Sequence, residues 1–376
     1  MEIYYLSTLI SEKLYSSLYK KDEKPGIQVQ VFNNLIVQGL IENGVNVKCL
    51  SAVPTSKELF DETFIKPEND LYFEYFPIIN IPILKDLLIV ITSFFKVRKA
   101  LKKNKDLSII CDVLSVTNSL GASLACKSLN RTCVGIVTDM PEFLESDDLY
   151  IKLVHKVISN CSDYIFLTEA MNQRLNPTKK PYKIIEGMCD FTPLAISKPR
   201  TKSIMYAGSL DRFNGIDVLI NAFLKVKTDH ELHIYGSGDY VDEIINITKT
   251  HPNIKFFGNV KHSEIKELIQ TSSFLINPRG TTHELVKYSF PSKTMEYLAS
   301  GTPFLCTKLP CIPTEYFKFL NVFESDDEEG ISKGIQKALD TKYETLLTKA
   351  NKGQLFVLQY KNNKVQTNKI IELIKE

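Results

Sequence analysis

The sequence has little of what marks several large classes of protein. Its net charge is only +2 over 376 residues, which argues against a strongly basic nucleic-acid binder. Its eight cysteines form no Cys-x-x-Cys pair and have no histidine nearby at zinc-finger spacing. We therefore expect reduced thiols inside a protein core, and we expect no nucleic acid among the partners.

Long apolar runs are absent as well. The most apolar segment, residues 87–95, is far shorter than the roughly 20 residues that span a bilayer, and charged residues bracket it. Residues 1–6 lack a basic region followed by a long apolar stretch, so no signal peptide is predicted. These absences predict a cytoplasmic protein with no membrane-spanning helix.

The segment around this apolar run has a basic end. Within residues 83–103, the last ten place two phenylalanines beside five cations, a composition typical of interfacial helices that meet anionic lipid. A core helix with a solvated basic end explains the same residues equally well. The sequence leaves open a peripheral contact of 83–103 with the inner face of the cell membrane.

Short apolar runs alternate with amphipathic stretches along the whole chain. A chain of 376 residues with 44% hydrophobic residues suits two domains. Alternation of strands with helices predicts parallel sheets wrapped by helices, so we expect an α/β fold of two doubly wound, Rossmann-like domains. The expected strands are 3–6, 46–51, 107–111, 132–138, 164–167 and 183–186 in the first half, and 204–207, 232–235, 254–257, 274–277 and 304–307 in the second. The chain should end in a helical stretch over 331–376.

Residues 277–303 contain the most informative local pattern. A strand ends there, a Ser-x-Pro signal starts a helix and a Gly-x-Pro signal closes it. The first turn of that helix would present free amides at Ser292, Lys293 and Thr294, with the positive end of the helix dipole behind them. This pattern favours a diphosphate site, and an ordinary surface helix with a basic first turn is the alternative.

Unusual residues also follow the other strands of the second half. In open α/β sheets the ligand binds past the carboxyl ends of the strands, so these loops should share one crevice. Glycines allow close backbone approach, and cations can neutralise a diphosphate without a metal ion. The residues of interest in the four loops are Gly208, Arg212, Gly236, Gly238, Val260, Arg279, Lys293 and Glu296.

These residues together resemble a known family. The stretch 206–303, with Tyr-Ser-Phe-Pro-Ser-Lys-Thr-Met-Glu-Tyr at 288–297, is similar to the nucleotide-binding domain of family 4 glycosyltransferases. It looks most like members from bacterial capsular and exopolysaccharide biosynthesis. The softer match before residue 190 rests on 24–28, 139–141 and 185–188. The resemblance implies the GT-B fold, in which two Rossmann-like domains face each other across a cleft.

The resemblance also implies what each part of the chain does. Residues 1–192 would bind the acceptor, and residues 203–355 would bind the nucleotide sugar. The irregular, proline-containing segment 193–202 is the expected linker. The last helix, 356–376, would pack back on the first domain.

By the same resemblance, Arg212 and Lys293 are catalytic cations that neutralise the leaving group, and Asp139 contacts the transferred sugar or the acceptor hydroxyl. Asp139 stands where many members have a histidine. His155, the only histidine before the linker, has a structural interpretation. Glu296 would bind the ribose. The full set expected at the donor is Gly208, Gly236, Gly238, Val260, Arg279, Tyr288, Ser292, Thr294 and Glu296.

The chain departs from the family pattern in the donor half. Tyr288 occupies the position of the first glutamate of the usual Glu-x7-Glu motif. The role of that carboxylate is either missing or taken by Glu284 or by Tyr288 itself. The usual arginine and lysine after the first strand are Ser209 and Asn214. Arg212 would therefore act as a substitute cation.

The implied activity is that of a retaining hexosyltransferase. It would use a nucleotide-diphosphate sugar, expected to be UDP-linked, without a metal or other cofactor. The acceptor would be a saccharide or lipid-linked saccharide of surface polysaccharide biosynthesis. Two alternatives remain: a non-catalytic partner subunit of the same fold, encouraged by the departures above, and a sugar-nucleotide epimerase, which would need carboxylates and a histidine in the first half.

Overall fold

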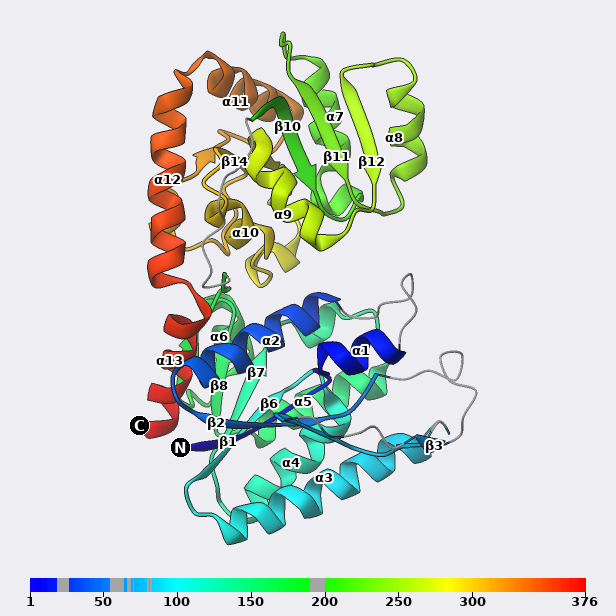
Figure 1. Ribbon diagram of the computed structural model, residues 1–376, viewed down its shortest axis with the longest axis vertical. Helices are drawn as coiled ribbons and strands as arrows, with labels where there is room; N and C mark the ends of the chain where they lie inside the picture. The colour runs from blue at the N-terminus through cyan, green and yellow to red at the C-terminus, as the bar shows by residue number, and fades with distance from the viewer. Residues whose placement is uncertain are drawn as a thin grey trace. The chain divides into compact units, whose positions relative to one another are not determined.

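The computed structural model describes residues 1–18, 27–54, 64–65, 69, 71–79, 81, 83–189 and 200–376. They form unit 1, which comprises Met1–Met188 and Asn363–Glu376, and unit 2, which comprises Cys189–Asn362. Each unit has its own sheet wrapped by helices (Figure 1), which confirms the α/β class. Most of the expected linker, and residues 24–26 of the resemblance, lie outside the described residues.

Unit 1 is built on a seven-stranded parallel sheet with the order β4-β2-β1-β6-β7-β8-β9. All the strands expected in this half are present, with small shifts at their ends, and the edge strand β4 is an addition. The strands are β1 (Glu2–Ser7), β2 (Asn46–Ser51), β4 (Phe73–Tyr75), β6 (Leu107–Asp112), β7 (Cys133–Val137), β8 (Asp163–Phe166) and β9 (Tyr182–Ile184). A separate antiparallel pair is formed by β3 (Phe64–Ile65) and β5 (Ile78–Ile79).

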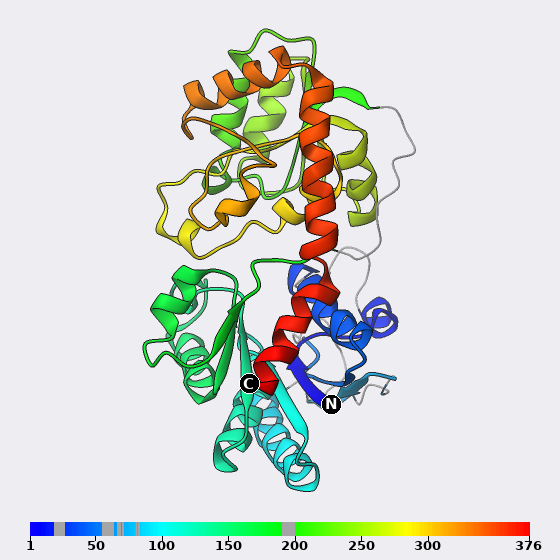
Figure 2. The same ribbon diagram turned by 90° about the vertical axis from the view of Figure 1, so that its left-hand side faces the viewer.

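The helices of unit 1 include one from the far end of the chain. They are α1 (Glu12–Leu18), α2 (Ile27–Glu42), α3 (Leu84–Lys103), α4 (Val116–Ser128), α5 (Asp148–Asn160), α6 (Glu169–Leu175) and α13 (Asn363–Lys375). Helix α13 packs on α2 (Figure 2). The two backbones are so close at Gly39 that a Cβ there would lie 2.5 Å from the Asn363 carbonyl oxygen. Asn43 also donates from Nδ2 to the Lys364 carbonyl at 2.7 Å. The expected return of the last helix to the first domain is confirmed.

Unit 2 has a six-stranded parallel sheet with the order β12-β11-β10-β13-β14-β15. Its strands are β10 (Thr201–Ala207), β11 (Glu231–Tyr235), β12 (Ile254–Gly258), β13 (Ser272–Asn277), β14 (Phe304–Cys306) and β15 (Asn321–Val322). Its helices are α7 (Ile216–Leu224), α8 (Val241–Thr248), α9 (His262–Thr271), α10 (Lys293–Ala299), α11 (Glu328–Asp340) and α12 (Tyr343–Tyr360). The stretch expected to be helical over 331–376 is thus three helices.

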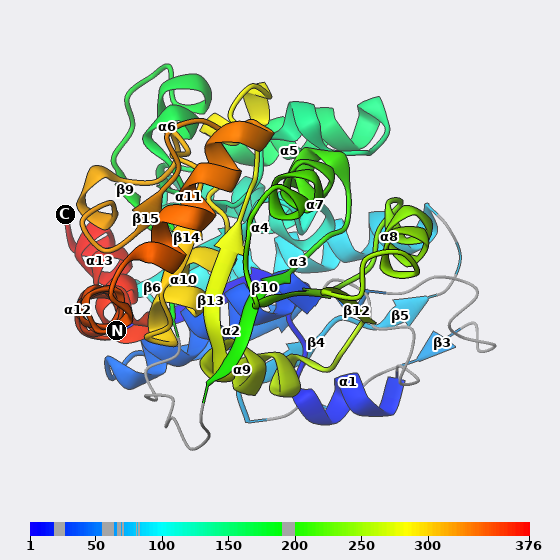
Figure 3. The same ribbon diagram turned by 90° about the horizontal axis from the view of Figure 1, so that it is seen from above.

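The two faces of this second sheet are covered by different helices (Figure 3). Successive side chains of a strand point to opposite faces. In β10, Ile204 and Tyr206 enter the core shared with α7 and α11, whereas Met205 and Ala207 enter the core shared with α9 and α10. Chain order reverses around β10, so its carboxyl end is the point where ligands of doubly wound sheets bind.

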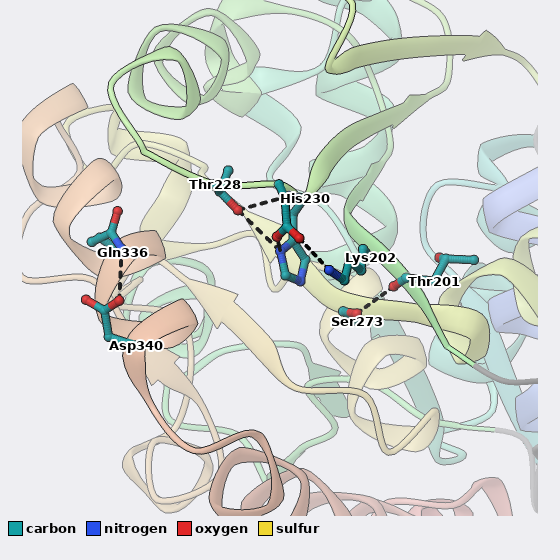
Figure 4. A network of polar contacts seen from close by, with 8 residues as sticks. Thr201, Lys202, Thr228, His230, Ser273, Gln336 and Asp340 are labelled. Carbon is teal, nitrogen blue, oxygen red and sulfur yellow. Dashed lines mark hydrogen bonds and ion pairs between the residues drawn. The ribbon is translucent and has the colours of Figure 1, made fainter.

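A polar network closes the opposite, amino-terminal edge of the same sheet (Figure 4). There Lys202 pairs with Asp229, and Ser273 Oγ donates to the Thr201 carbonyl at 2.5 Å. These residues bond one another at the end of the strands that is remote from the loops singled out above. They serve the stability of the sheet edge.

All eight cysteines are buried and free, as expected. Three of them pack against one another in the core: Cys133 Sγ lies 3.7 Å from Cys111 Sγ and 3.8 Å from Cys161 Sγ. None of the helices in the described ranges is long and apolar enough to cross a bilayer.

Candidate active site

The loops that follow β10, β11 and β12 are joined backbone to backbone. The Gly236 amide donates to the Gly258 carbonyl at 2.9 Å. Gly236 has a φ of 134°, and a Cβ there would overlap the Gly208 carbonyl oxygen, while one on Gly238 would overlap that of Leu210. Packing between the loops therefore requires glycine at 236 and 238. Contact of Gly208, Gly236 and Gly238 with a donor stays a prediction.

Arg279, directly after β13, is a buried cation with unusual surroundings. Its side chain is only 6% exposed, and its guanidinium carbon lies 4.4 Å from the centre of the Phe213 ring. Nη1 is 3.4 Å from the Ser289 carbonyl oxygen, and Nε has no hydrogen-bond partner among the described residues. Burial lowers the pKa of Arg279, an effect that Cys311 and Asp211 oppose. A desolvated guanidinium held by a ring and a carbonyl is a ready contact for an anion.

The first turn of α10 brings Lys293 and Glu296 together. Lys293 Nζ lies 3.2 Å from Glu296 Oε2, and both side chains are partly buried. The Thr294 amide donates to the Pro291 carbonyl at 2.9 Å, and its side chain is fully buried. The expectation that the Thr294 amide is free is therefore corrected: a tight turn before the helix already uses it. A diphosphate contact of the Ser292 backbone stays a prediction.

Tyr288 and Glu284, the two candidates for the missing carboxylate, are linked. The Tyr288 hydroxyl donates to Glu284 Oε1 at 3.3 Å. Tyr288 is 8% exposed, whereas Glu284 lies on the surface. The hydrogen bond joins a buried ring to an exposed carboxylate, and which of the two replaces the missing carboxylate stays open.

Arg212, in the loop after β10, lies against an aromatic ring. The Arg212 guanidinium carbon lies 5.8 Å from the centre of the Tyr240 ring, on an exposed side chain. A contact of Arg212 with the diphosphate of a donor stays a prediction.

Asn214 has a bracing role in that same loop. Its Nδ2 donates to both carboxylate oxygens of Asp211, at 2.8 and 2.9 Å. Asn214, which occupies the position of the family's lysine, thus forms its hydrogen bonds within the loop. After β12, Val260 packs partly buried against the core, so its backbone is what remains for a ligand.

Comparison with known proteins gives a family match in the second unit. Residues 201–341 match the family model described as "Glycosyl transferases group 1". The match includes the loops after β10 to β13 and helix α10. No curated protein matches the chain at a significant level.

Solved structures show that the chain has the GT-B fold over its full length. Anabaena Alr3699/HepE in complex with UDP is 15% identical with a TM-score of 0.68, covering 100% of both chains; another structure of that protein holds UDP-glucose. Sucrose-phosphate synthase from Thermosynechococcus elongatus is 15% identical with a TM-score of 0.66, covering 100% of this chain and 98% of its own. A variant of S. aureus TarM in complex with fondaparinux, alpha-GlcNAc-glycerol and UDP is 12% identical with a TM-score of 0.67, covering 100% of both chains.

In unit 1, Asp139 follows β7 at the carboxyl edge of the sheet. The residue as a whole is exposed. Loss of water around its carboxyl group nevertheless raises the pKa of Asp139, and a hydrogen bond from Thr138 opposes this rise. His155 lies on α5 with Nε2 4.0 Å from Glu142 Oε1, on the surface. The structural interpretation of His155 and a role for Asp139 in transfer both stay predictions.

Sequence reasoning missed a buried polar network beside Asp139. Asp112, at the end of β6, is 3% exposed. Its Oδ2 accepts hydrogen bonds from Asn33 Nδ2 at 3.2 Å and from Ser115 Oγ at 3.0 Å, and Tyr5 donates to Asn33 Oδ1. Burial raises the pKa of Asp112, and the nearby charge of Asp139 adds to the rise. The signal in the sequence was an acidic residue ending an apolar strand next to β1, where the strand order reverses.

Asp112→Asn should destabilise unit 1 by about 1 to 3 kcal/mol, although it removes a buried charge. The new amide would point hydrogens at Asn33 Nδ2 and Ser115 Oγ, which now donate to the carboxylate. Because the pKa is raised in the folded state, stability from this group is present below the unfolded pKa of about 3.9 and is lost as pH rises through the folded pKa. In urea unfolding, the deficit of the variant should be wider near pH 4 than near pH 7.

The matched control for this substitution is Asp139→Asn, which removes an exposed carboxylate from the same edge. It should change the free energy of unfolding far less. Equal effects of the two substitutions would mean that charge, and not the hydrogen-bond network, dominates at Asp112.

Proposed function

We propose that this glycosyltransferase moves a hexosyl unit, with retention, from a UDP-sugar to a saccharide or lipid-linked saccharide acceptor of surface polysaccharide biosynthesis, without a divalent metal. The observation that carries the proposal is Arg279, a buried guanidinium without a carboxylate ion pair among the described residues, on the loop that leads to Lys293 and Glu296. UDP is chosen because similar folds were solved with it. The eight free thiols fit a reducing cytoplasm.

The proposed chemistry follows from where charge develops. As the bond between the sugar C1 and the diphosphate oxygen breaks, negative charge grows on the diphosphate, and Arg279 and Lys293 stabilise it electrostatically. The acceptor oxygen bonds to C1 on the same face, and its proton passes to the departing phosphate oxygen. Binding that strengthens only in the transition state raises turnover, so the cations matter more than any protein base.

One position of the donor can be assigned by charge. Glu296 is the proposed partner of the ribose hydroxyls, since a carboxylate accepts from both. In the described structure it pairs with Lys293 at 3.2 Å, which holds the two side chains at the same end of α10.

Among the described residues no group of three or more His, Cys, Asp or Glu side chains could hold a metal ion. Metal independence is part of the proposal and is tested directly below.

The decisive experiment incubates the purified chain with a panel of nucleotide sugars and follows release of nucleoside diphosphate, with and without EDTA. The expected result is UDP release from a UDP-hexose at the same rate in both. Loss of activity in EDTA that Mg²⁺ restores would overturn the metal-free mechanism. UDP binding without turnover of any donor would favour the non-catalytic subunit, and an isomerised donor sugar would favour the epimerase.

Arg279→Met should weaken UDP binding at least about tenfold, because a charged hydrogen-bond partner of the diphosphate contributes about 1.5 to 3 kcal/mol. Without nucleotide, the thermal midpoint of the variant should be unchanged or higher, since a desolvated charge has been replaced by an apolar chain of similar length. Calorimetric titration with UDP and thermal unfolding measure the two effects.

Arg212→Met is the matched control for that prediction. It makes the same chemical change at an exposed arginine of the neighbouring loop, where the guanidinium lies over Tyr240. Its effect on UDP affinity should be the smaller of the two. A larger effect at Arg212 would reverse the ranking of the cations.

A further inference from the structure

Helix α3 in unit 1 has two unlike faces, and one of them is fully explained by packing. Ile89, Ser93, Val97 and Leu101 recur at every fourth position and are buried. They lie toward α4, which runs beside α3 (Figure 1). Gly121 of α4 permits the close approach, because a Cβ there would overlap Ser93 Oγ.

The opposite face of α3 is apolar and exposed over its first three turns. Leu84, Leu87, Ile91 and Phe95 are 42%, 54%, 42% and 63% exposed. Steps of three and four residues place these side chains on one stripe of a helix. Single exposed hydrophobic residues are normal on a protein surface, whereas a continuous row of four is typical of an interaction site. A core helix with a solvated basic end, the alternative that the sequence left open, does not account for this row.

The same face continues as a basic surface toward the end of the helix. Four cationic side chains occupy the last two turns: Arg98, Lys99, Lys102 and Lys103. No carboxylate pairs with any of them in the part of the chain that the structure describes; Arg98 Nε donates to Ser128 Oγ at 3.2 Å. Lys96, by contrast, turns toward β4 and pairs with Glu74. We define the α3 stripe as the four apolar and these four cationic side chains.

We propose that the α3 stripe docks on an anionic membrane surface, with the apolar side chains at the boundary of headgroups and acyl chains and the cations against lipid phosphates. An apolar row that continues into unpaired cations on one helix face complements anionic lipid in both respects. A second copy of the chain would bring the same four cations and no complementary acidic row on α3, whose one acidic residue is Asp86. The membrane is therefore the partner that the charges fit.

This inference rests on unit 1 alone. It does not depend on the donor chemistry of unit 2, so either proposal can fail without the other. It locates the proposed reaction at the membrane surface, where the enzyme would encounter a lipid-linked acceptor.

The test is co-sedimentation of the full chain with vesicles of phosphatidylcholine alone or mixed with phosphatidylglycerol. Wild type should bind the mixed vesicles, lose binding as salt is raised, and not bind pure phosphatidylcholine. Lys99→Glu with Lys102→Glu, and separately Ile91→Ser with Phe95→Ser, should each lower the bound fraction at least about tenfold, because both halves of the stripe contribute. All four side chains are exposed, so folding should be retained, and far-UV circular dichroism and thermal midpoint verify it.

The control variant reverses two exposed lysines of α11, Lys333→Glu with Lys337→Glu. It changes the net charge equally but lies in unit 2, and its vesicle binding should match wild type. Equal losses in the two charge-reversal variants, or equal binding to both kinds of vesicle, would overturn the proposal. So would self-association that Ile91→Ser with Phe95→Ser abolishes while wild type ignores vesicles, because the stripe would then be an interface between copies.

Discussion

Lys293→Ala should lower turnover with the preferred UDP-sugar by about one to three orders of magnitude, the range for removing one preorganised charge donor. Lys293 opens α10, and its ammonium is held 3.2 Å from Glu296 on a partly buried side chain. A cation fixed there before the donor arrives needs no reorganisation when charge develops on the diphosphate. The loss should fall on kcat more than on KM, because charge on the departing oxygen grows mainly in the transition state.

The ion pair with Glu296 allows a sharper test of the same prediction. If Lys293 served only to position Glu296, then Lys293→Ala would add nothing once Glu296→Gln has removed the carboxylate. We expect Lys293→Ala to lower kcat in both backgrounds, measured as a double-mutant cycle on UDP release. Near-normal transfer by Lys293→Ala would end the assignment of Lys293 as a catalytic cation.

The strands were the part of the fold that the sequence predicted best. Interior parallel strands are buried on both faces, so runs such as 107–111 and 274–277 are almost continuously apolar. The edge strands β4 and β15 were missed because they are short, and most of their side chains are only partly buried. The end of α12 was missed for a different reason: Lys361 and Asn362 interrupt the helix with no proline or glycine to mark the break.

The loops that meet at the carboxyl edge of the second sheet could be predicted, but the directions of their side chains could not. Carboxyl ends of parallel strands meet at one edge whatever the loops contain, so sheet topology alone selects the loops. Where a side chain points depends on its neighbours in space: Asn214 turns to Asp211, and Arg212 to Tyr240. No local pattern in the sequence distinguishes these arrangements from the expected ones.

Asp112 illustrates the same limit in unit 1. Its partners come from α2 and from the turn after β6, and Asn33 is itself bonded to Tyr5 of β1. These residues are far apart in the chain, so their common network exists only once the sheet has formed. A single aspartate at a strand end carries too little information to predict it.

Gly236→Ala should destabilise unit 2 by about 3 kcal/mol and weaken donor binding with it. Two costs add: a side chain at a φ of 134° is strained by about 1 to 3 kcal/mol, and overpacking against the Gly208 carbonyl costs a similar amount. The chain has no tryptophan, so urea unfolding should be followed by far-UV circular dichroism. Hydrogen exchange of the Leu210 and Gly236 amides, which bond across these loops, should rise in the variant.

Gly258→Ala separates the two costs, because its φ of 67° is also left-handed but nothing lies within 4 Å of the added Cβ. It should cost only the backbone strain, about 1 to 2 kcal/mol, in the loop that bonds to Gly236. The excess at Gly236 then measures the contact between the loops after β10 and β11. If Gly236→Ala proved no more harmful than Gly258→Ala, the loops after β10 and β11 would not pack closely at Gly236, and this edge would lack the rigidity that fixed charges require.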